Sequence, residues 1–158
     1  MIVSIHSRKS VETLIRCGNF PKNAALISFY DPLHTAPPGY APVDYSETTD
    51  PVFYAAVPDL DWDAFEDDAE GLQAFLTQAP ELAAFIKTAH QNGYDFICQC
   101  DYGQSRSAGC AMAILEFYEH AGQTIFEDPR YFPNQLIFGK VLAALNHGNK
   151  RKERACSF

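Results

Sequence analysis

The 158-residue sequence lacks several features that would define its class at once. It has no apolar run approaching the ~20 residues that a membrane-spanning helix needs. Its 12 Lys and Arg are outnumbered by 20 Asp and Glu, which gives a formal net charge of −8. We therefore expect neither nucleic acid nor an anionic membrane as a primary partner, because both are bound by basic faces. No internal repeat or linker-like stretch interrupts the chain, so we expect one domain over residues 1–158, with a flexible basic tail at 150–158.

The cysteine pattern argues against two kinds of site. The five cysteines are an odd number, and no second Cys or His pair complements Cys98 and Cys100 at the spacing of a zinc site. We therefore expect no metal site. The apolar start of the chain soon becomes polar and does not resemble a signal peptide, so we expect a cytoplasmic location with the cysteines as thiols.

The chain has ample material for a folded core, since 47% of its residues are hydrophobic and 13% are aromatic. Apolar stretches of strand length alternate with helical patterns. We expect strands at 2–5, 24–30, 52–57 and 94–98, and helices from 10 to 18, from 80 to 93, from 107 to about 120 and after 134. This order predicts an α/β fold with a mostly parallel central sheet flanked by helices. The proline-rich stretch 33–51 is expected to be a mobile segment or a substrate-facing rim.

One stretch concentrates the chemistry: it runs from Cys100 to Ser107, between an apolar strand and a helix that is apolar nearly all round. Five residues between a cysteine and an arginine make a loop that can wrap one tetrahedral oxyanion. Backbone N–H groups, the positive end of the following helix and the guanidinium would all face that anion. The candidate anion-binding residues are Asp101, Tyr102, Gly103, Gln104, Ser105 and Arg106. The same surroundings favour the thiolate of Cys100, which is a strong nucleophile.

The segment from Gln99 to Ser107 resembles the signature loop of the cysteine-dependent protein tyrosine phosphatases, usually His-Cys-x-x-Gly-x-x-Arg-Ser/Thr. Its Gly-x-Ser-Arg-Ser part is most similar to the compact dual-specificity branch and its bacterial and phage relatives. Pro133-Asn134 also looks like the Pro-Asn that such enzymes carry before their last helix. In that branch an aspartate lies a little over thirty residues before the cysteine. Asp68 lies at 100 − 68 = 32, and Asp67, Asp59, Asp61 and Asp63 are the alternatives.

The resemblance implies a phosphoric monoester hydrolase that acts on phosphotyrosine, with phosphoserine/threonine and small phosphomonoesters as further substrates, through a cysteinyl-phosphate. Cys100 would attack phosphorus while Arg106 holds the equatorial oxygens. Asp68 would protonate the leaving group and later accept a proton from water. Ser107 would hydrogen-bond the sulfur, and Gly103 would permit a turn that a β-carbon obstructs. The resemblance implies no metal and no cofactor.

One departure from the family pattern leaves other functions open. Gln99 stands where the family carries His, and a glutamine can donate and accept hydrogen bonds but cannot carry charge. The alternatives are a non-catalytic phosphate-binding module and, third, a rhodanese-like sulfurtransferase, whose active loop also begins with cysteine. Nothing in the residue pattern indicates an oligomeric state.

Overall fold

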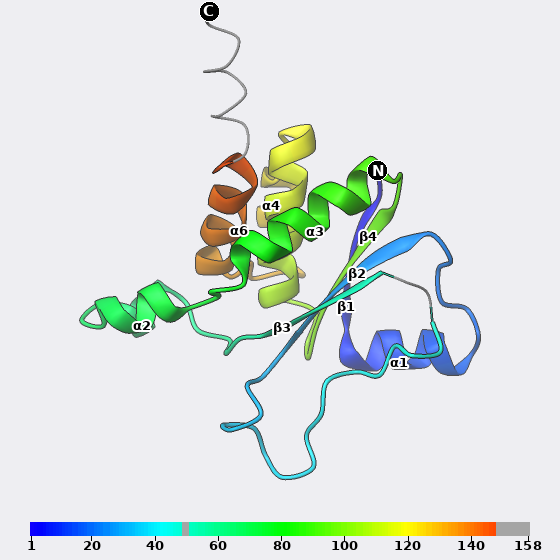
Figure 1. The fold of residues 1–158 in the computed structure, drawn as a ribbon, viewed down its shortest axis with the longest axis horizontal. Coiled ribbons are helices and arrows are strands. Elements are labelled where there is room, and N and C mark those ends of the chain that lie inside the picture. Colours follow the sequence, from blue (N-terminus) through cyan, green and yellow to red (C-terminus); the bar gives the residue numbers. More distant parts are fainter. Residues whose placement is uncertain (49–50, 148–158) are drawn as a thin grey trace, which may run out of the picture.

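The centre of the molecule is a four-stranded sheet in which every strand runs parallel to its neighbours (Figure 1). The computed structural model describes residues 1–48 and 51–147. The strands are β1 (Val3–Ser7), β2 (Ala24–Tyr30), β3 (Val52–Ala56) and β4 (Asp95–Cys100), in the spatial order β1-β4-β2-β3. The predicted single-domain α/β fold with a parallel sheet is confirmed.

The parallel arrangement gathers the residues that follow the strands at one edge of the sheet. In register, Ser7 of β1 lies beside Cys100 of β4, and Ser28 of β2 lies beside Gln99. Ligands of open α/β sheets bind at the carboxyl ends of the strands. The segments that begin at Arg8, Asp31, Val57 and Asp101 therefore meet where the phosphatase-like loop begins.

Helices cover the sheet unequally. In Figure 1, α3 (Ala79–Gln91), α4 (Arg106–Glu119) and α6 (Gln135–His147) lie on one side, and α1 (Arg8–Arg16) lies on the other. Three short helices, η1 (Trp62–Phe65), α2 (Ala69–Ala74) and α5 (Gln123–Phe126), lie in the connections. None of the described helices is long and apolar enough to span a membrane.

The two faces of the sheet belong to two hydrophobic clusters. Ile27 and Phe29 of β2 point into the larger cluster with α3, α4 and α6, whereas Leu26 points into a smaller one with Val11 of α1. The nine-residue α1 does not fill this second face alone. Val43 and Tyr45, each 3% exposed, complete the smaller cluster. Val43 and Tyr45 are therefore core and not part of a mobile segment or substrate-facing rim, whereas Tyr40 of the same 33–51 segment contacts Asp101 of the loop.

The helix ends lie close to the sequence expectations. Ser7 caps α1, which begins at Arg8 instead of the expected position 10, and the Ser7 Oγ accepts a hydrogen bond from the amide of Ser10 at 3.1 Å. The left-handed His120 ends α4, in agreement with the expected end at about 120. The first nine residues of α4 are all buried, as expected for a helix that holds a loop from beneath. The predicted basic tail lies outside the described residues.

Candidate active site

The candidate nucleophile, Cys100, is the last residue of β4 and is only 2% exposed. Its Sγ lies 3.1 Å from the Oγ of Ser107, and the amide of Gly103 donates to the sulfur at 3.3 Å. The loop leads directly into α4, whose N-terminus carries a positive partial charge. The sulfur of Cys100 is therefore placed among hydrogen-bonding groups at a helix N-terminus.

Gly103 occupies a position that no other residue fits. Its φ of +68° lies in the left-handed region, and a β-carbon there would approach the backbone of the β1–α1 junction to 2.5 Å at the Ser7 nitrogen and 2.7 Å at the His6 carbonyl carbon. The loop therefore packs directly against the start of α1. The predicted reason for a glycine at this position is confirmed.

Arg106, the first residue of α4, is buried and held by three acceptors. Its Nη1 donates to Asp31 Oδ1 at 2.6 Å and to the carbonyl of Val57 at 2.8 Å. Its Nη2 donates to Asp101 Oδ2 at 3.0 Å. Its Nε is buried and, uniquely among the buried side-chain nitrogens and oxygens of the described residues, has no hydrogen-bond partner. A buried donor without an acceptor calls for a ligand that supplies one.

The electrostatic surroundings keep Arg106 charged. Burial by itself would lower its pKa, but the negative charges of Asp31, Cys100 and Asp59 outweigh burial and raise the pKa above the usual value for arginine. The guanidinium is therefore available as a permanent cation for an oxyanion.

Asp59 contacts the loop at Ser105. Its Oδ1 accepts a hydrogen bond from Ser105 Oγ at 2.6 Å and a longer one from Asn134 Nδ2 at 3.3 Å. The side chain is otherwise exposed and borders a hollow of about 340 Å³ that Ser105 and Asn134 also line. A carboxyl group thus lies at the rim of the loop from Cys100 to Arg106, which we call the anion cradle.

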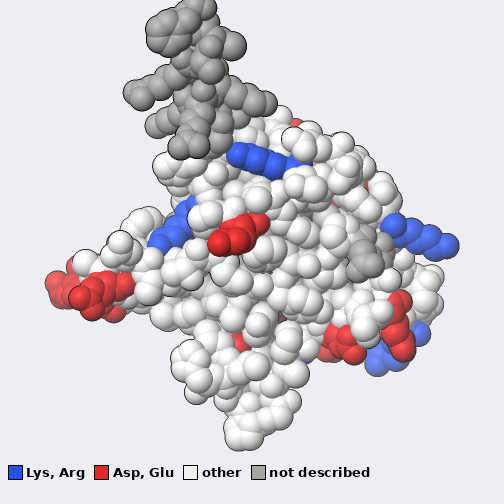
Figure 2. Space-filling model, in the orientation of Figure 1, with Lys and Arg blue, Asp and Glu red and all other residues white. Residues whose placement is uncertain are grey.

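The resemblance implies Asp68 as the acid, and in the structure its carboxylate is engaged at α2. It caps α2, where its Oδ1 accepts from the amide of Gly71 at 2.8 Å. Within the described residues, no hydrogen bond or ion pair joins Asp68 or Asp67 to the loop. Asp61 is occupied by the start of α6, since its two oxygens accept from the amides of Gln135 and Leu136. Figure 2 shows acidic side chains gathered at the α2 end of the molecule.

Gln99 is fully hydrogen-bonded at its oxygen. Its Oε1 accepts from Ser28 Oγ at 2.7 Å and from Tyr45 Oη at 2.9 Å, and all three side chains are buried. Burial raises the pKa of Tyr45, so this tyrosine stays a neutral donor. The residue before the nucleophile is therefore held rigidly although it is not histidine.

Tyr102 and Gln104 are the exposed residues of the loop. Tyr102 is 81% exposed, and the carbonyl of Gln104 accepts from the amide of Phe132 at 3.0 Å. Across residues 1–48 and 51–147, no group of three or more His, Cys, Asp or Glu side chains is arranged to hold a metal ion.

The sequence reasoning missed Asp31, Arg8 and Tyr40, which contact Arg106 or Asp101. A signal for two of them was present. Asp31 directly follows β2 and Arg8 directly follows β1, and residues after parallel strands converge on one edge. Tyr40 lies in the middle of an irregular segment, where periodicity carries no information.

Three solved structures resemble this one over nearly its whole length. Tk-PTP in its active form matches with a TM-score of 0.53 and 15% identity, covering 93% of each chain. A human tyrosine phosphatase-like serine/threonine/tyrosine-interacting protein matches with a TM-score of 0.50 and 11% identity, covering 95% of this chain and 87% of that one. A leucine-rich repeat and phosphatase domain-containing protein from Entamoeba histolytica gives 0.50 and 12%, covering 99% and 91%.

At the level of sequence, no protein-family model and no curated protein matches the chain. The likeness therefore concerns the fold, and it spans the sheet, the loop and the helices alike. The chain therefore shares its fold with these tyrosine phosphatase-like and phosphatase-domain proteins.

Proposed function

We propose that this protein hydrolyses phosphomonoesters, with phosphotyrosine and then phosphoserine or phosphothreonine as substrates, through a cysteinyl-phosphate intermediate. The observation that carries the proposal is the pairing of a hydrogen-bonded, buried thiol with a buried arginine Nε that has no acceptor, both in one loop. A phosphoryl oxygen would supply the acceptor that Nε needs, and the phosphorus would then face the sulfur of Cys100.

In the first step, the Cys100 thiolate forms a bond to phosphorus as the ester P–O bond breaks. Arg106 and the loop amides stabilise the charge on the equatorial oxygens. The leaving oxygen takes its proton from a carboxylic acid at the rim of the cradle. We assign this role to Asp59, because it accepts a 2.6 Å hydrogen bond from Ser105 of the loop, whereas Asp68 caps α2.

In the second step, water attacks phosphorus and the S–P bond breaks. The same carboxylate accepts the proton that water loses. Ser107, whose Oγ lies 3.1 Å from the sulfur, stabilises the departing thiolate with its hydroxyl hydrogen. The products are inorganic phosphate and the free enzyme, so no other reactant is consumed.

The test is turnover of a small aryl phosphate in the presence of a chelator, between pH 5 and 8. We expect Cys100→Ser and Arg106→Ala to abolish turnover, and acid quenching of the wild type to trap phosphate on Cys100. Cys17→Ser serves as the matched control, since Cys17 is an exposed free thiol outside the loop. Turnover that persists in Cys100→Ser would reject the proposal.

A non-catalytic phosphate-binding module is the second candidate, and Gln99 in place of histidine is the observation that favours it. One structural neighbour is itself described as phosphatase-like and interacting. This alternative predicts that the wild type binds a phosphotyrosine peptide but releases no phosphate and forms no trapped intermediate. A single-turnover experiment with excess protein distinguishes the two functions.

A further inference from the structure

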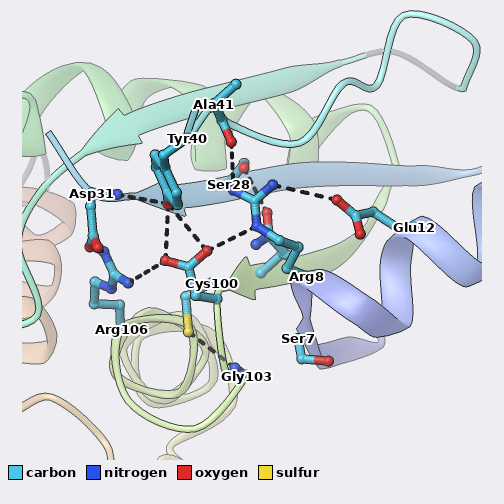
Figure 3. A network of polar contacts seen from close by, with 12 residues as sticks. Ser7, Arg8, Glu12, Ser28, Asp31, Tyr40, Ala41, Cys100, Gly103 and Arg106 are labelled. Carbon is cyan, nitrogen blue, oxygen red and sulfur yellow. Dashed lines mark hydrogen bonds and ion pairs between the residues drawn. The ribbon is translucent and has the colours of Figure 1, made fainter. Parts of the chain in front are cut away.

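The carboxylate of Asp101 is the hub of a network that brings together Arg8, Tyr40 and Arg106, which are labelled in Figure 3. Its oxygens accept from Arg8 Nε at 3.0 Å, from Tyr40 Oη at 2.9 Å and from Arg106 Nη2 at 3.0 Å. The amide of Arg8 also donates to the Asp101 carbonyl at 3.2 Å. The residue after the nucleophile is thus tied to α1, to the β2–β3 connection and to the arginine of the loop.

Tyr40 is itself fixed in place. Its hydroxyl accepts from the amide of Asp31 at 3.0 Å while donating to Asp101, so both of its hydrogen-bonding functions are used. The guanidinium of Arg8 lies 4.9 Å from the centre of the Tyr40 ring and donates to the carbonyl of Ala41 at 2.6 Å. Burial raises the pKa of Tyr40, so the hydroxyl remains a neutral donor.

These contacts hold the guanidinium of Arg106 at both of its terminal nitrogens. Asp31 and Val57 fix Nη1, and Asp101 fixes Nη2. A guanidinium is planar, so fixing two nitrogens also sets the direction of the third. That third nitrogen is Nε, the buried donor without a partner.

We propose that Tyr40 and Arg8 are positioning residues that act through the Asp101 carboxylate to aim Nε of Arg106 into the anion cradle. An ionised carboxylate has no hydrogen to donate, so the Asp101 side chain orients the arginine and does not bind the anion itself. This inference rests on the proposed function, in which Arg106 binds the phosphoryl oxygens.

Tyr40→Phe is the informative variant, because it removes one hydroxyl and changes no charge. Tyr54→Phe is the matched control, since the Tyr54 hydroxyl donates to Val43 in the same β2–β3 connection and has no hydrogen bond to the loop. Three quantities are measured: kcat and KM for an aryl phosphate, the affinity for inorganic tungstate, and the rate of Cys100 alkylation by iodoacetamide.

For Tyr40→Phe we expect kcat to fall about tenfold and tungstate to bind several-fold more weakly, because a misaimed donor is lost from the transition state. KM for the aryl phosphate should change less than kcat. Alkylation of Cys100 should keep its wild-type rate and pH profile, because Tyr40→Phe changes no charge near the sulfur. Tyr54→Phe should match the wild type in all three quantities.

The network also predicts coupling. If Tyr40 acts through Asp101, Tyr40→Phe should have no further effect in a chain that already carries Asp101→Ala. Additive losses in the double variant would overturn the inference, as would wild-type values for Tyr40→Phe.

Two further results would also overturn it. Tighter tungstate binding by Tyr40→Phe would mean that Asp101 competes with the anion for Arg106 instead of aiming it. Parallel losses of turnover, alkylation rate and melting temperature would mean that Tyr40 supports only the fold. A wild-type chain that neither turns over aryl phosphate nor binds tungstate would reject the proposed function and the inference together. A wild type that does both, with one of the contrary variant results above, would reject the inference alone.

Discussion

At the scale of single residues, the geometry of Gly103 makes two separate demands, for a left-handed backbone and for the absence of a β-carbon. We expect Gly103→Ala to lower the free energy of unfolding by about 2–4 kcal/mol and to abolish turnover, because the β-carbon meets backbone atoms. Gly18→Ala is the control, since Gly18 has a φ of +67° but a β-carbon on it would meet nothing within 4 Å. It should cost only about 1 kcal/mol. If urea denaturation gives equal decreases in the free energy of unfolding for Gly103→Ala and Gly18→Ala, backbone conformation alone matters at Gly103.

The identity of the general acid is also decided at this scale. We expect Asp59→Asn to slow hydrolysis of an alkyl phosphate by about 10²–10³-fold and that of a good aryl leaving group much less, since phenolates leave without a proton. Asp68→Asn should hydrolyse both esters at the wild-type rate, because Asp68 caps α2. The comparison of kcat for the two esters in the two variants checks this. The reverse pattern would restore Asp68 as the acid.

At the scale of elements, the strands and the loop were predictable from the sequence, whereas the contact of Asp59 with the loop was not. The apolar run of β2 predicted Ala24–Tyr30, and the Cys-x5-Arg spacing is local, so it defined the nucleophile and Arg106 together. Which carboxylate reaches the loop depends on the path of the chain through η1, α2 and α3, between β3 and β4. Residue spacing does not encode that path, whereas the parallel sheet brings Asp59, three residues after β3, to the loop.

The side chains that contact Arg106, Asp101 and Gln99 differ in how far the sequence predicts them. Asp31 follows β2 immediately, so the rule for parallel sheets would have placed it at the site. Tyr40 and Tyr45 reach Asp101 and Gln99 from an irregular segment. Their contacts depend on the packing of that segment over the sheet, which no local pattern records.

Asn134 links the elements that carry the two halves of the chemistry. The Asn134 side chain donates from Nδ2 to Asp59 and to the carbonyl of Leu60. Its Oδ1 accepts from the backbone amide of Ile137. The backbone amide of Asn134 donates to the carbonyl of Ser105. We expect Asn134→Ala to lower the free energy of unfolding by about 1–3 kcal/mol, through a lost helix cap and unpaired buried groups.

The same variant should slow alkyl phosphates more than aryl phosphates, because the loop that carries Asp59 loses its anchor. Asn146→Ala is the control on the same helix, where the amide donates only to Leu142 within α6. Urea denaturation and the ratio of kcat for the two esters measure both effects. A stability loss with an unchanged ester ratio would limit Asn134 to a structural role.

At the scale of the whole molecule, the site is assembled from both ends of the chain. Residues from Ser7 to Asp59 supply the partners of the loop, and residues 99–134 supply the loop and the anchor of the acid. These contacts join residues far apart in the sequence, so they require the assembled sheet. An isolated loop peptide would therefore lack the constraints that orient Arg106.

The charge of the whole molecule predicts a preference among substrates. The net charge is −8, and Glu66, Asp67 and Glu70 are exposed on the segment that follows Asp59. We expect a phosphotyrosine peptide with flanking lysines to have about a tenfold higher kcat/KM at low ionic strength than the same peptide with flanking glutamates, because an acidic surface steers cations toward it.

The difference should shrink as salt is raised to about 0.5 M, since the Debye length then falls below the spacing of surface charges. The combined variant Glu66→Gln, Asp67→Asn and Glu70→Gln should narrow the ratio at low salt and leave kcat/KM for a small aryl phosphate nearly unchanged, because that substrate lacks the flanking charges. Measuring kcat/KM for both peptides across a salt series checks this. A ratio that does not respond to salt or to the three substitutions would mean that direct contacts in the cleft, and not the field of the acidic segment, select the peptide.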